Sequence, residues 1–351
     1  MSSENIISQL ANAISSDALI TDFSEREYFS MDVFDIDQVA DLVFQPRSKN
    51  EISIALKILS ETDYQIIPRG GGMSYTGGYT PSTKRSVIVD TSLLNQILEI
   101  NPEDMYITVE AGCTWKSIYQ ALKPMGMRLP FFGTNSGSMA TVGGGLSNGA
   151  LFFGTGKYGS AADNVLGMEV IIADGTLIKT GQNAFANSKP HHRTYGPDMT
   201  GLFCHDAGSL GIKVQATFPL IYWPKSIDYL SFAYKTLEDS VAALSSVSKS
   251  GLTEECYVLD PSSAGNLADV SNIEGAKSVI KVFREQSSFI KGIKESFKMA
   301  FTGRSVIPDD AYSLHMVIAN HSQQALDYDL KAAKAIAQNH NGESIPNTVP
   351  K

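Results

Sequence analysis

The sequence predicts an α+β protein built in two parts. Up to about residue 223, short apolar runs alternate with helical patterns and with two glycine-rich loops. After Pro224 the glycine-rich loops stop, and strands separated by helices continue. The chain has 351 residues, 43% of them hydrophobic, so it can bury a large core without disulfides or metal ions. We expect an N-terminal helical segment at 1–37, a first domain at 38–223 and a second at 224–351.

The N-terminal segment does not have the pattern of a targeting signal, and we expect none there. Its first basic residue is Arg26, and Ile6, Leu10 and Ile14 recur at helical spacing, which predicts a short amphipathic helix. The chain contains no run of about 18 apolar residues, so we expect no transmembrane segment. A cytoplasmic location is the prediction, and peripheral association with a membrane is left open.

Three apolar runs and one helical pattern predict a first, parallel sheet. LVFQP (42–46) is a strand that ends at a proline, and Ser48 then caps a helix over 50–62. YQIIP (64–68) and SVIVD (86–90) are two further strands. The order strand–helix–strand favours parallel strands joined by a right-handed crossover.

Two hairpins and a helix predict a second layer of structure. The first hairpin covers 97–112, and a helix follows over 114–126. The second hairpin covers 165–181, with an Asp-Gly pair at its turn, and 211–223 is the last strand of the first domain.

The second domain has the pattern of an antiparallel sheet covered on one face. Strands are expected at 226–235, 255–260 and 311–320, each followed by a helical pattern, the last of them reaching about His340. This alternation is typical of a ferredoxin-like arrangement. Because the chain stops at ESIPNTVPK, we expect an incomplete domain, a half-sheet without its closing strands, and a missing C-terminal piece.

Charge and cysteine content exclude several classes of protein. Lys and Arg number 28 against 37 Asp and Glu, so the net charge of −9 offers no basic field for nucleic acid or anionic lipid. Three widely spaced cysteines contain no C-x-x-C pair, which indicates reduced thiols in a cytosolic protein.

The first glycine-rich loop, PRGGGMS (68–74), follows directly on an apolar strand. Three successive glycines allow positive φ, so several N–H groups can point to one place and form an anion nest for a phosphate or diphosphate. Arg69 adds charge or braces the loop. The competing interpretation is a glycine-rich turn without a ligand.

The second glycine-rich loop covers 133–160. Thr141 is expected to cap a short helix over 142–150, and free amides at its start would favour a diphosphate. The glycines at 143–145 would let a flat ligand approach the backbone closely. Two such loops suit a large dinucleotide held between subdomains.

A G-x-G-x-x-G match at 154–159 is rejected as a dinucleotide fingerprint. The next strand begins near Val165, which leaves no room for the helix of a βαβ unit, and Asp174 belongs to a hairpin turn. Tyr158 stands where a P-loop needs Ser or Thr, so that motif is rejected as well.

Four segments in order carry a resemblance: PRGGGMSYTGG, GTNSGSMATVGGGLSNGA, KYG…DNVLGMEVIIADG and GPDMTGLFCHDAGSLGIKV. Over about residues 40–223 the chain resembles the PCMH-type FAD-binding module of the vanillyl-alcohol oxidase superfamily. Within it the chain is similar to FAD-linked glycolate oxidase and D-lactate dehydrogenase-type proteins. The resemblance implies a two-subdomain FAD-binding domain followed by a cap domain.

The resemblance also implies cofactor-binding residues. The residues that match the family's motifs are Pro68, Arg69, Gly70, Gly71, Gly72, Met73, Ser74, Ser136, Ser138, Thr141, Gly143, Gly144, Asn148, Gly149, Gly159, Gly211 and Ile212. Members that bind the flavin covalently through the first loop carry a histidine after the glycines. Met73 stands there, so non-covalent FAD is expected.

The implied activity is FAD-dependent oxidation of a hydroxyl-bearing carbon, most simply of a 2-hydroxy acid of the D-lactate or glycolate type, with hydride transfer to flavin N5. The partners would be a small-molecule substrate and an unidentified electron acceptor; a homo-oligomer is left open. Family members keep the catalytic base in the cap and C-terminal segment, so no catalytic residue is named. A phenol or aryl-alcohol oxidase on the same fold, and an inactive flavin-binding fragment or subunit, remain alternatives.

The histidines give weaker signals. Adjacent His191 and His192 cannot easily converge with His205 on one metal ion, so no metal site is expected; a place at the mouth of the active site is left open. His205 and Asp206 resemble a relay pair, but neighbours on a strand would face opposite sides. His315 lies in a predicted strand, and substrate-facing and structural roles are both open.

Overall fold

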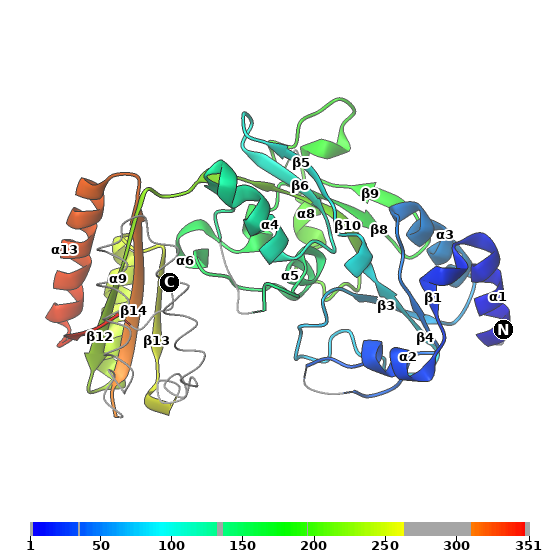
Figure 1. The fold of residues 1–351 in the computed structure, drawn as a ribbon, viewed down its shortest axis with the longest axis horizontal. Coiled ribbons are helices and arrows are strands. Elements are labelled where there is room, and N and C mark those ends of the chain that lie inside the picture. Colours follow the sequence, from blue (N-terminus) through cyan, green and yellow to red (C-terminus); the bar gives the residue numbers. More distant parts are fainter. Residues whose placement is uncertain (1–2, 34–35, 132–135, 195, 263–309, 348–351) are drawn as a thin grey trace. The chain divides into compact units, whose positions relative to one another are not determined.

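The computed structural model describes residues 3–33, 36–131, 136–194, 196–262 and 310–347. The chain divides into two compact units, Met1–Trp223 and Pro224–Lys351, each described by itself below. Figure 1 shows the elements of both units. Among the described residues, no helix combines the length and apolar character needed to cross a bilayer.

The first unit begins with a small sheet whose parallel core is confirmed. Its strands lie in the order β1 (Leu19–Ile20), β2 (Leu42–Phe44), β4 (Ser86–Asp90) and β3 (Gln65–Arg69). Both β2 and β3 pair with β4 in parallel, whereas β1, which the sequence did not predict, pairs with β2 antiparallel.

Helices complete the first layer. The crossover helix α3 (Lys49–Ser60) begins where Ser48 accepts a hydrogen bond from the Glu51 amide, as predicted. The N-terminal helix α1 (Ser3–Ala13) packs its Ile6 and Leu10 into the same core as α3. A second helix, α2 (Phe23–Ser30), follows and is capped by Asp22.

The second sheet of this unit is antiparallel and contains both predicted hairpins. Its order is β5 (Ile97–Asn101), β6 (Tyr106–Glu110), β10 (Ile212–Pro219), β8 (Gly167–Ile171) and β9 (Leu177–Lys179). The predicted helix after the first hairpin is α4 (Trp115–Leu122), capped by Thr114. The remaining short elements of the unit are β7 (Met127–Arg128), α5 (Val142–Asn148), α6 (Thr155–Tyr158), α7 (Ala161–Asn164), α8 (Met199–Leu202) and β11 (Ile221–Tyr222).

A buried carboxylate joins the two layers of the first unit. Glu169 on β8 accepts hydrogen bonds from Lys49 at the start of α3, at 2.6 Å, and lies 3.0 Å from Lys179 on β9. Burial by itself would raise the pKa of Glu169, but the two ammonium groups hold that pKa below its usual value. The ion pair between Lys49 and Glu169 therefore connects the crossover helix to the second sheet.

The second unit is a four-stranded antiparallel sheet with α9 (Leu237–Ser250) and α13 (Gln323–Asn339) packed against it. The strand order is β13 (Glu255–Leu259), β14 (Tyr312–Asn320), β12 (Ser226–Tyr234) and β15 (Glu343–Ile345), and Figure 1 shows both helices beside the sheet. A fourth strand, β15, which the sequence did not predict, pairs with β12 at the edge opposite β13, and the expectation of an incomplete sheet stays a prediction. The helical pattern expected after 255–260 falls mostly on 263–309, outside the described residues.

Candidate functional site

The first glycine loop begins where β3 ends, beside the carboxyl end of β4. Of its three glycines only Gly72 has positive φ, at +66°. A Cβ on Gly70 would lie 2.2 Å from the Thr141 hydroxyl oxygen, and one on Gly71 would lie 1.8 Å from the Met139 carbonyl oxygen. The positive φ that three glycines allow is therefore used at one of them, and the other two are required because the second glycine loop packs directly on the first.

The backbone amides of this loop form an unpaired row. Within the described residues, no hydrogen bond engages the N–H groups of the five residues Gly70–Ser74. Protein structures seldom leave so many consecutive donors without partners unless solvent or a ligand accepts from them. Successive N–H groups of this kind form a concave site for an anion.

The second glycine loop supports the first instead of offering amides of its own. Thr141 caps α5, accepting from the Gly144 amide at 3.4 Å, as predicted. The amides of Val142 and Gly143 donate to carbonyl oxygens in the segment 111–113, at 2.9 and 2.7 Å. The expectation of free amides at this helix start is therefore wrong, since the preceding strand and turn already accept from them.

Arg69, the last residue of β3, is buried among aromatic rings. Its guanidinium carbon lies 5.0 Å from the ring centre of Phe29, 5.7 Å from that of Tyr28 and 5.8 Å from that of Tyr79. Its Nε has no acceptor among the described residues, and within those residues the guanidinium donates one long hydrogen bond, 3.4 Å, to the Gly70 carbonyl. Burial raises the pKa of the Tyr79 hydroxyl to about 12, so the ring stays neutral beside the cation. A positive charge with unused donors thus lies next to the row of amides.

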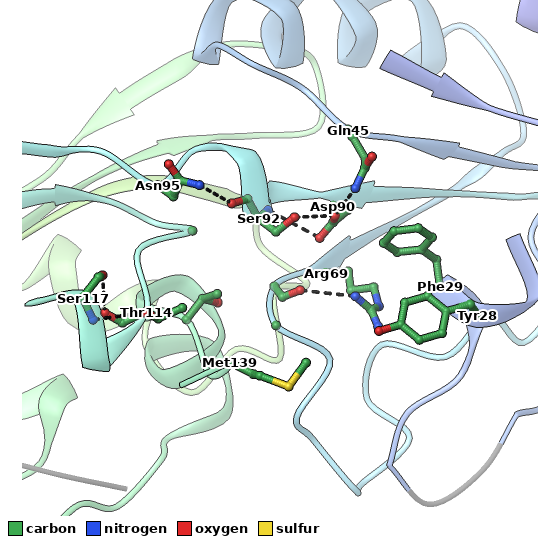
Figure 2. A pocket seen from close by; sticks show the side chains of 14 residues that line it. Tyr28, Phe29, Gln45, Arg69, Asp90, Ser92, Asn95, Thr114, Ser117 and Met139 are labelled. Carbon is green, nitrogen blue, oxygen red and sulfur yellow. Dashed lines mark hydrogen bonds between the residues drawn. The ribbon is translucent and has the colours of Figure 1, made fainter. Parts of the chain in front are cut away.

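Arg69 and the first two residues of the amide row, Gly70 and Gly71, line a cavity of about 430 Å³, within the size range of small-molecule sites. Figure 2 shows it between Arg69 with the two α2 rings on one side and Thr114 with Ser117 on the other. Besides Arg69, the cavity is lined by Tyr28, Phe29, Gln45, Gly70, Gly71, Asp90, Ser92, Asn95, Gly112, Thr114, Ser117, Met139 and Thr141.

A polar cluster closes the cavity at the end of β4. The buried Asp90 carboxylate accepts from the Gln45 amide nitrogen and from the Ser92 hydroxyl, both at 2.7 Å. Asn95 donates to the Ser92 carbonyl at 3.2 Å. The cavity therefore has a cationic and amide-rich side and a side rich in hydroxyl and carboxamide groups, which suits a ligand with both phosphate and sugar-like parts.

The turn at 205–211 borders the other end of α5. His205 donates its amide to the Leu146 carbonyl at 2.9 Å, and a Cβ on Gly149 would lie 2.0 Å from its ring nitrogen Nδ1. The sequence analysis placed His205 and Asp206 on a strand, and this is wrong. Both residues lie in a turn, in which His205 has a φ of +57°. Asp206 instead accepts from Lys213 on β10 at 2.7 Å, with both side chains 2% exposed, and burial lowers the pKa of Lys213.

The structure thus brings four of the residues implied by the resemblance into the cavity wall: Arg69, Gly70, Gly71 and Thr141. The others lie in the same region of the fold but outside that wall. Pro68 ends β3 with Arg69; Gly72, Met73 and Ser74 continue the loop; Ser136 and Ser138 precede Thr141; Gly143, Gly144 and Asn148 form α5 and Gly149 caps it; Gly159 follows α6; and Gly211 and Ile212 begin β10.

Sequence reasoning missed most of the polar lining. Asp90 was identified only as the end of a strand, yet carboxyl ends of neighbouring parallel strands lie at one edge, so its place beside Arg69 was a usable signal. Tyr28 and Phe29 gave no signal, because nothing in their local pattern indicates which loop α2 packs on.

The other histidines that the sequence singled out are His191, His192 and His315. His191 and His192 are exposed, and no group of three or more His, Cys, Asp and Glu side chains within the described ranges converges as metal ligands would. His315 on β14 is 1% exposed, and its ring nitrogens lie 3.0 Å from Ser231 Oγ and 2.9 Å from Ser313 Oγ. Its hydrogen-bonding capacity is therefore used inside the second unit.

Comparisons with known proteins agree with this geometry. The family model described as FAD binding domain matches residues 40–181. The chain is 29% identical over 213 residues to the mitochondrial D-lactate dehydrogenase [cytochrome] 1 of Saccharomyces cerevisiae, covering 60% of this chain and 35% of that protein. It is 32% identical over 209 residues to the glycolate oxidase subunit GlcD of Bacillus subtilis, covering 59% and 42%. The chain thus spans less than half the length of these two relatives.

A solved structure extends the likeness to the fold of both units. The structure of p-cresol methylhydroxylase with substrate bound matches 97% of this chain and 64% of that one, with a TM-score of 0.75 and 18% identity. The resemblance inferred from the motifs is confirmed over residues 40–181, which form an FAD binding domain. The residues present fit that cofactor: the unpaired amides at 70–74 and the close approach of glycine backbones suit its diphosphate.

Proposed function

We propose that this chain, whose residues 40–181 form an FAD binding domain, acts in the FAD-dependent oxidation of a 2-hydroxy acid at its hydroxyl-bearing carbon. The observation that carries the proposal is the row of unpaired amides at 70–74 beside the buried Arg69. The relatives named D-lactate dehydrogenase and glycolate oxidase subunit support the choice of substrate class.

The residues of the first loop would hold the diphosphate of FAD. The amides at 70–74 would donate to its oxygens, and the Arg69 guanidinium would offset its charge. Asp90 and Gln45 would face its sugar hydroxyls or its adenine. Met73 stands where covalent family members carry histidine, so the cofactor would be held without a covalent bond from this loop.

The chemistry divides between cofactor and protein. When bound, FAD supplies the acceptor for the hydride that leaves the substrate carbon. The first unit would orient the cofactor through the loop at 70–74 and the Arg69 guanidinium. The substrate would also require a base for its hydroxyl proton, and we assign that base to no described residue, because His315 is engaged by two serines.

The substrate class is tested by anaerobic bleaching of the bound flavin. D-lactate, glycolate and larger 2-hydroxy acids are each added to the purified protein, with L-lactate and p-cresol as controls. Loss of the visible absorption of the oxidised flavin is expected with a D-2-hydroxy acid and not with p-cresol. Bleaching by p-cresol alone would favour the aryl-oxidase alternative, and bound flavin that no substrate bleaches would favour a flavin-binding subunit.

A further inference from the structure

We propose that an N-terminal arm, residues 22–33, is part of the cofactor site and that Tyr28 is its positioning residue. The match to the FAD binding domain begins at residue 40, so the arm lies outside it. Two of the cavity-lining side chains, Tyr28 and Phe29, nevertheless come from α2 within the arm. This inference rests on the proposed function, because it takes the ligand to be the adenosine diphosphate half of FAD.

The arm is tied to the loop that carries the unpaired amides. The Val33 amide donates to the Ser74 carbonyl at 3.1 Å, and the Gly77 amide donates to the Asp32 carboxylate at 2.8 Å. Both bonds fall at the end of the first glycine loop or just beyond it. The arm therefore restrains the loop at its C-terminal end, whereas the second glycine loop packs on it at Gly70 and Gly71.

The arm also holds the cation. The rings of Tyr28 and Phe29 pack edge to face, with centroids 5.4 Å apart, and both lie beside the Arg69 guanidinium. Contacts between a cation and ring faces at such distances are attractive. The two rings thus fix a guanidinium that makes one long hydrogen bond of its own within the described residues.

Tyr28 is the more informative of the two rings. Phe29 also packs with Ala40, Val43 and Ile88 of the first sheet, so its removal would disturb the core. Tyr28 is 55% exposed and lines the cavity, so its removal should alter the cavity wall with little effect on stability. Phe23 provides a matched control: it lies on the same helix, is 58% exposed and does not line the cavity.

The test measures FAD affinity of the full chain after the cofactor has been removed, by quenching of flavin fluorescence, together with the melting temperature of the apoprotein. We expect Tyr28→Ala to raise the Kd for FAD about tenfold, roughly the loss of one favourable ring contact with a desolvated cation. Phe23→Ala and Tyr28→Phe should leave the Kd within about twofold, since each keeps the ring at position 28 beside Arg69. All three apoproteins should melt close to the wild type, because the substituted side chains are exposed. ADP, used as a competitor, should lose affinity in Tyr28→Ala in parallel with FAD.

The outcomes separate the two proposals. If the wild type binds FAD and Tyr28→Ala binds it with the same Kd, the inference is overturned and the proposed function stays intact. An equal loss in Phe23→Ala would also overturn it, since the effect would then belong to the helix and not to the ring in the cavity. A wild-type chain that binds no FAD would overturn the proposed function and this inference together.

Discussion

At the scale of single residues, the site depends on glycines that are required for different reasons. Gly72 needs its positive φ, whereas Gly71 needs the absence of a side chain, because the backbone of Met139 lies against it. A Gly71→Asp substitution would therefore combine two effects, the steric clash of its Cβ and the repulsion between its carboxylate and a diphosphate. Even its Cβ would force the two glycine loops apart.

Gly71→Ala should therefore weaken both folding and FAD binding. The added Cβ would meet a carbonyl oxygen that cannot move alone, and overpacking of this kind costs about 1–3 kcal/mol of stability. Gly78→Ala is the control, because a Cβ there meets nothing closer than 3.5 Å and φ is not positive. Urea unfolding and FAD titration of both variants check this; equal behaviour of the two would contradict the packing argument.

At the scale of elements, the turn at 205–211 is fixed by one buried ion pair. Asp206 accepts from Lys213 on β10 and also from the Gly208 amide at 2.9 Å within its own turn. The carboxylate therefore ties the turn that packs on α5 to the central strand of the second sheet. Removing one member of such a pair leaves a buried charge without a partner.

Asp206→Asn should cost about 3–5 kcal/mol of stability, since Lys213 would remain buried and charged without its counterion. The double variant Asp206→Asn with Lys213→Met should recover a large part of that loss, because no unpaired charge would remain. Denaturant unfolding of the two single variants and the double variant measures the coupling. Additive losses would show that the two side chains act independently.

The sheet of the second unit contains an acid-sensitive group. Burial lowers the pKa of His315 on β14 from 6.5 to about 4. The unfolded chain binds a proton at this position as the pH falls below 6.5, while the folded chain stays neutral until about pH 4. Stability is therefore lost as the pH falls through this interval.

We expect this loss to reach up to about 3 kcal/mol by pH 4, the value that follows from about 1.4 kcal/mol for each pH unit. His315→Gln, which keeps polar atoms near both serines and does not titrate, should flatten the dependence between pH 6.5 and 4. Unfolding of wild type and variant across this range, followed by far-UV circular dichroism, is the measurement. Parallel pH profiles would show that another group is responsible.

At the scale of the whole molecule, sequence reasoning succeeds where the signal is local. Ser48 and Thr141 each cap the helix predicted after them, and the Asp-Gly turn forms with Gly175 at φ of +80°. These are interactions among residues three or fewer positions apart. The order of the strands in each sheet depends on pairing between residues far apart in the sequence. Beyond the hairpins, the sequence predicted only whether a sheet is parallel or antiparallel.

The cavity could not be predicted in the same way. Its wall is assembled from α2, from the ends of β2, β3 and β4, and from the turns before α4 and α5. Whether an amide in such a wall is available depends on which carbonyl lies opposite it. The amides before and within α5 looked free in sequence and are used by residues 111–113, whereas those at 70–74 are unpaired among the described residues. Which amides are free and which are paired can be told only from the three-dimensional structure.

The most direct test of the central claim is the flavin content of the purified 351-residue chain. The visible absorption spectrum is recorded, the protein is precipitated with acid, and the supernatant is analysed for FAD. We predict one FAD per chain, all of it released into the supernatant, because the loop at 70–74 would hold the diphosphate through amides and Met73 offers no covalent link. Colour that stays with the pellet would contradict non-covalent binding, and a colourless protein that FAD cannot reconstitute would contradict the site itself.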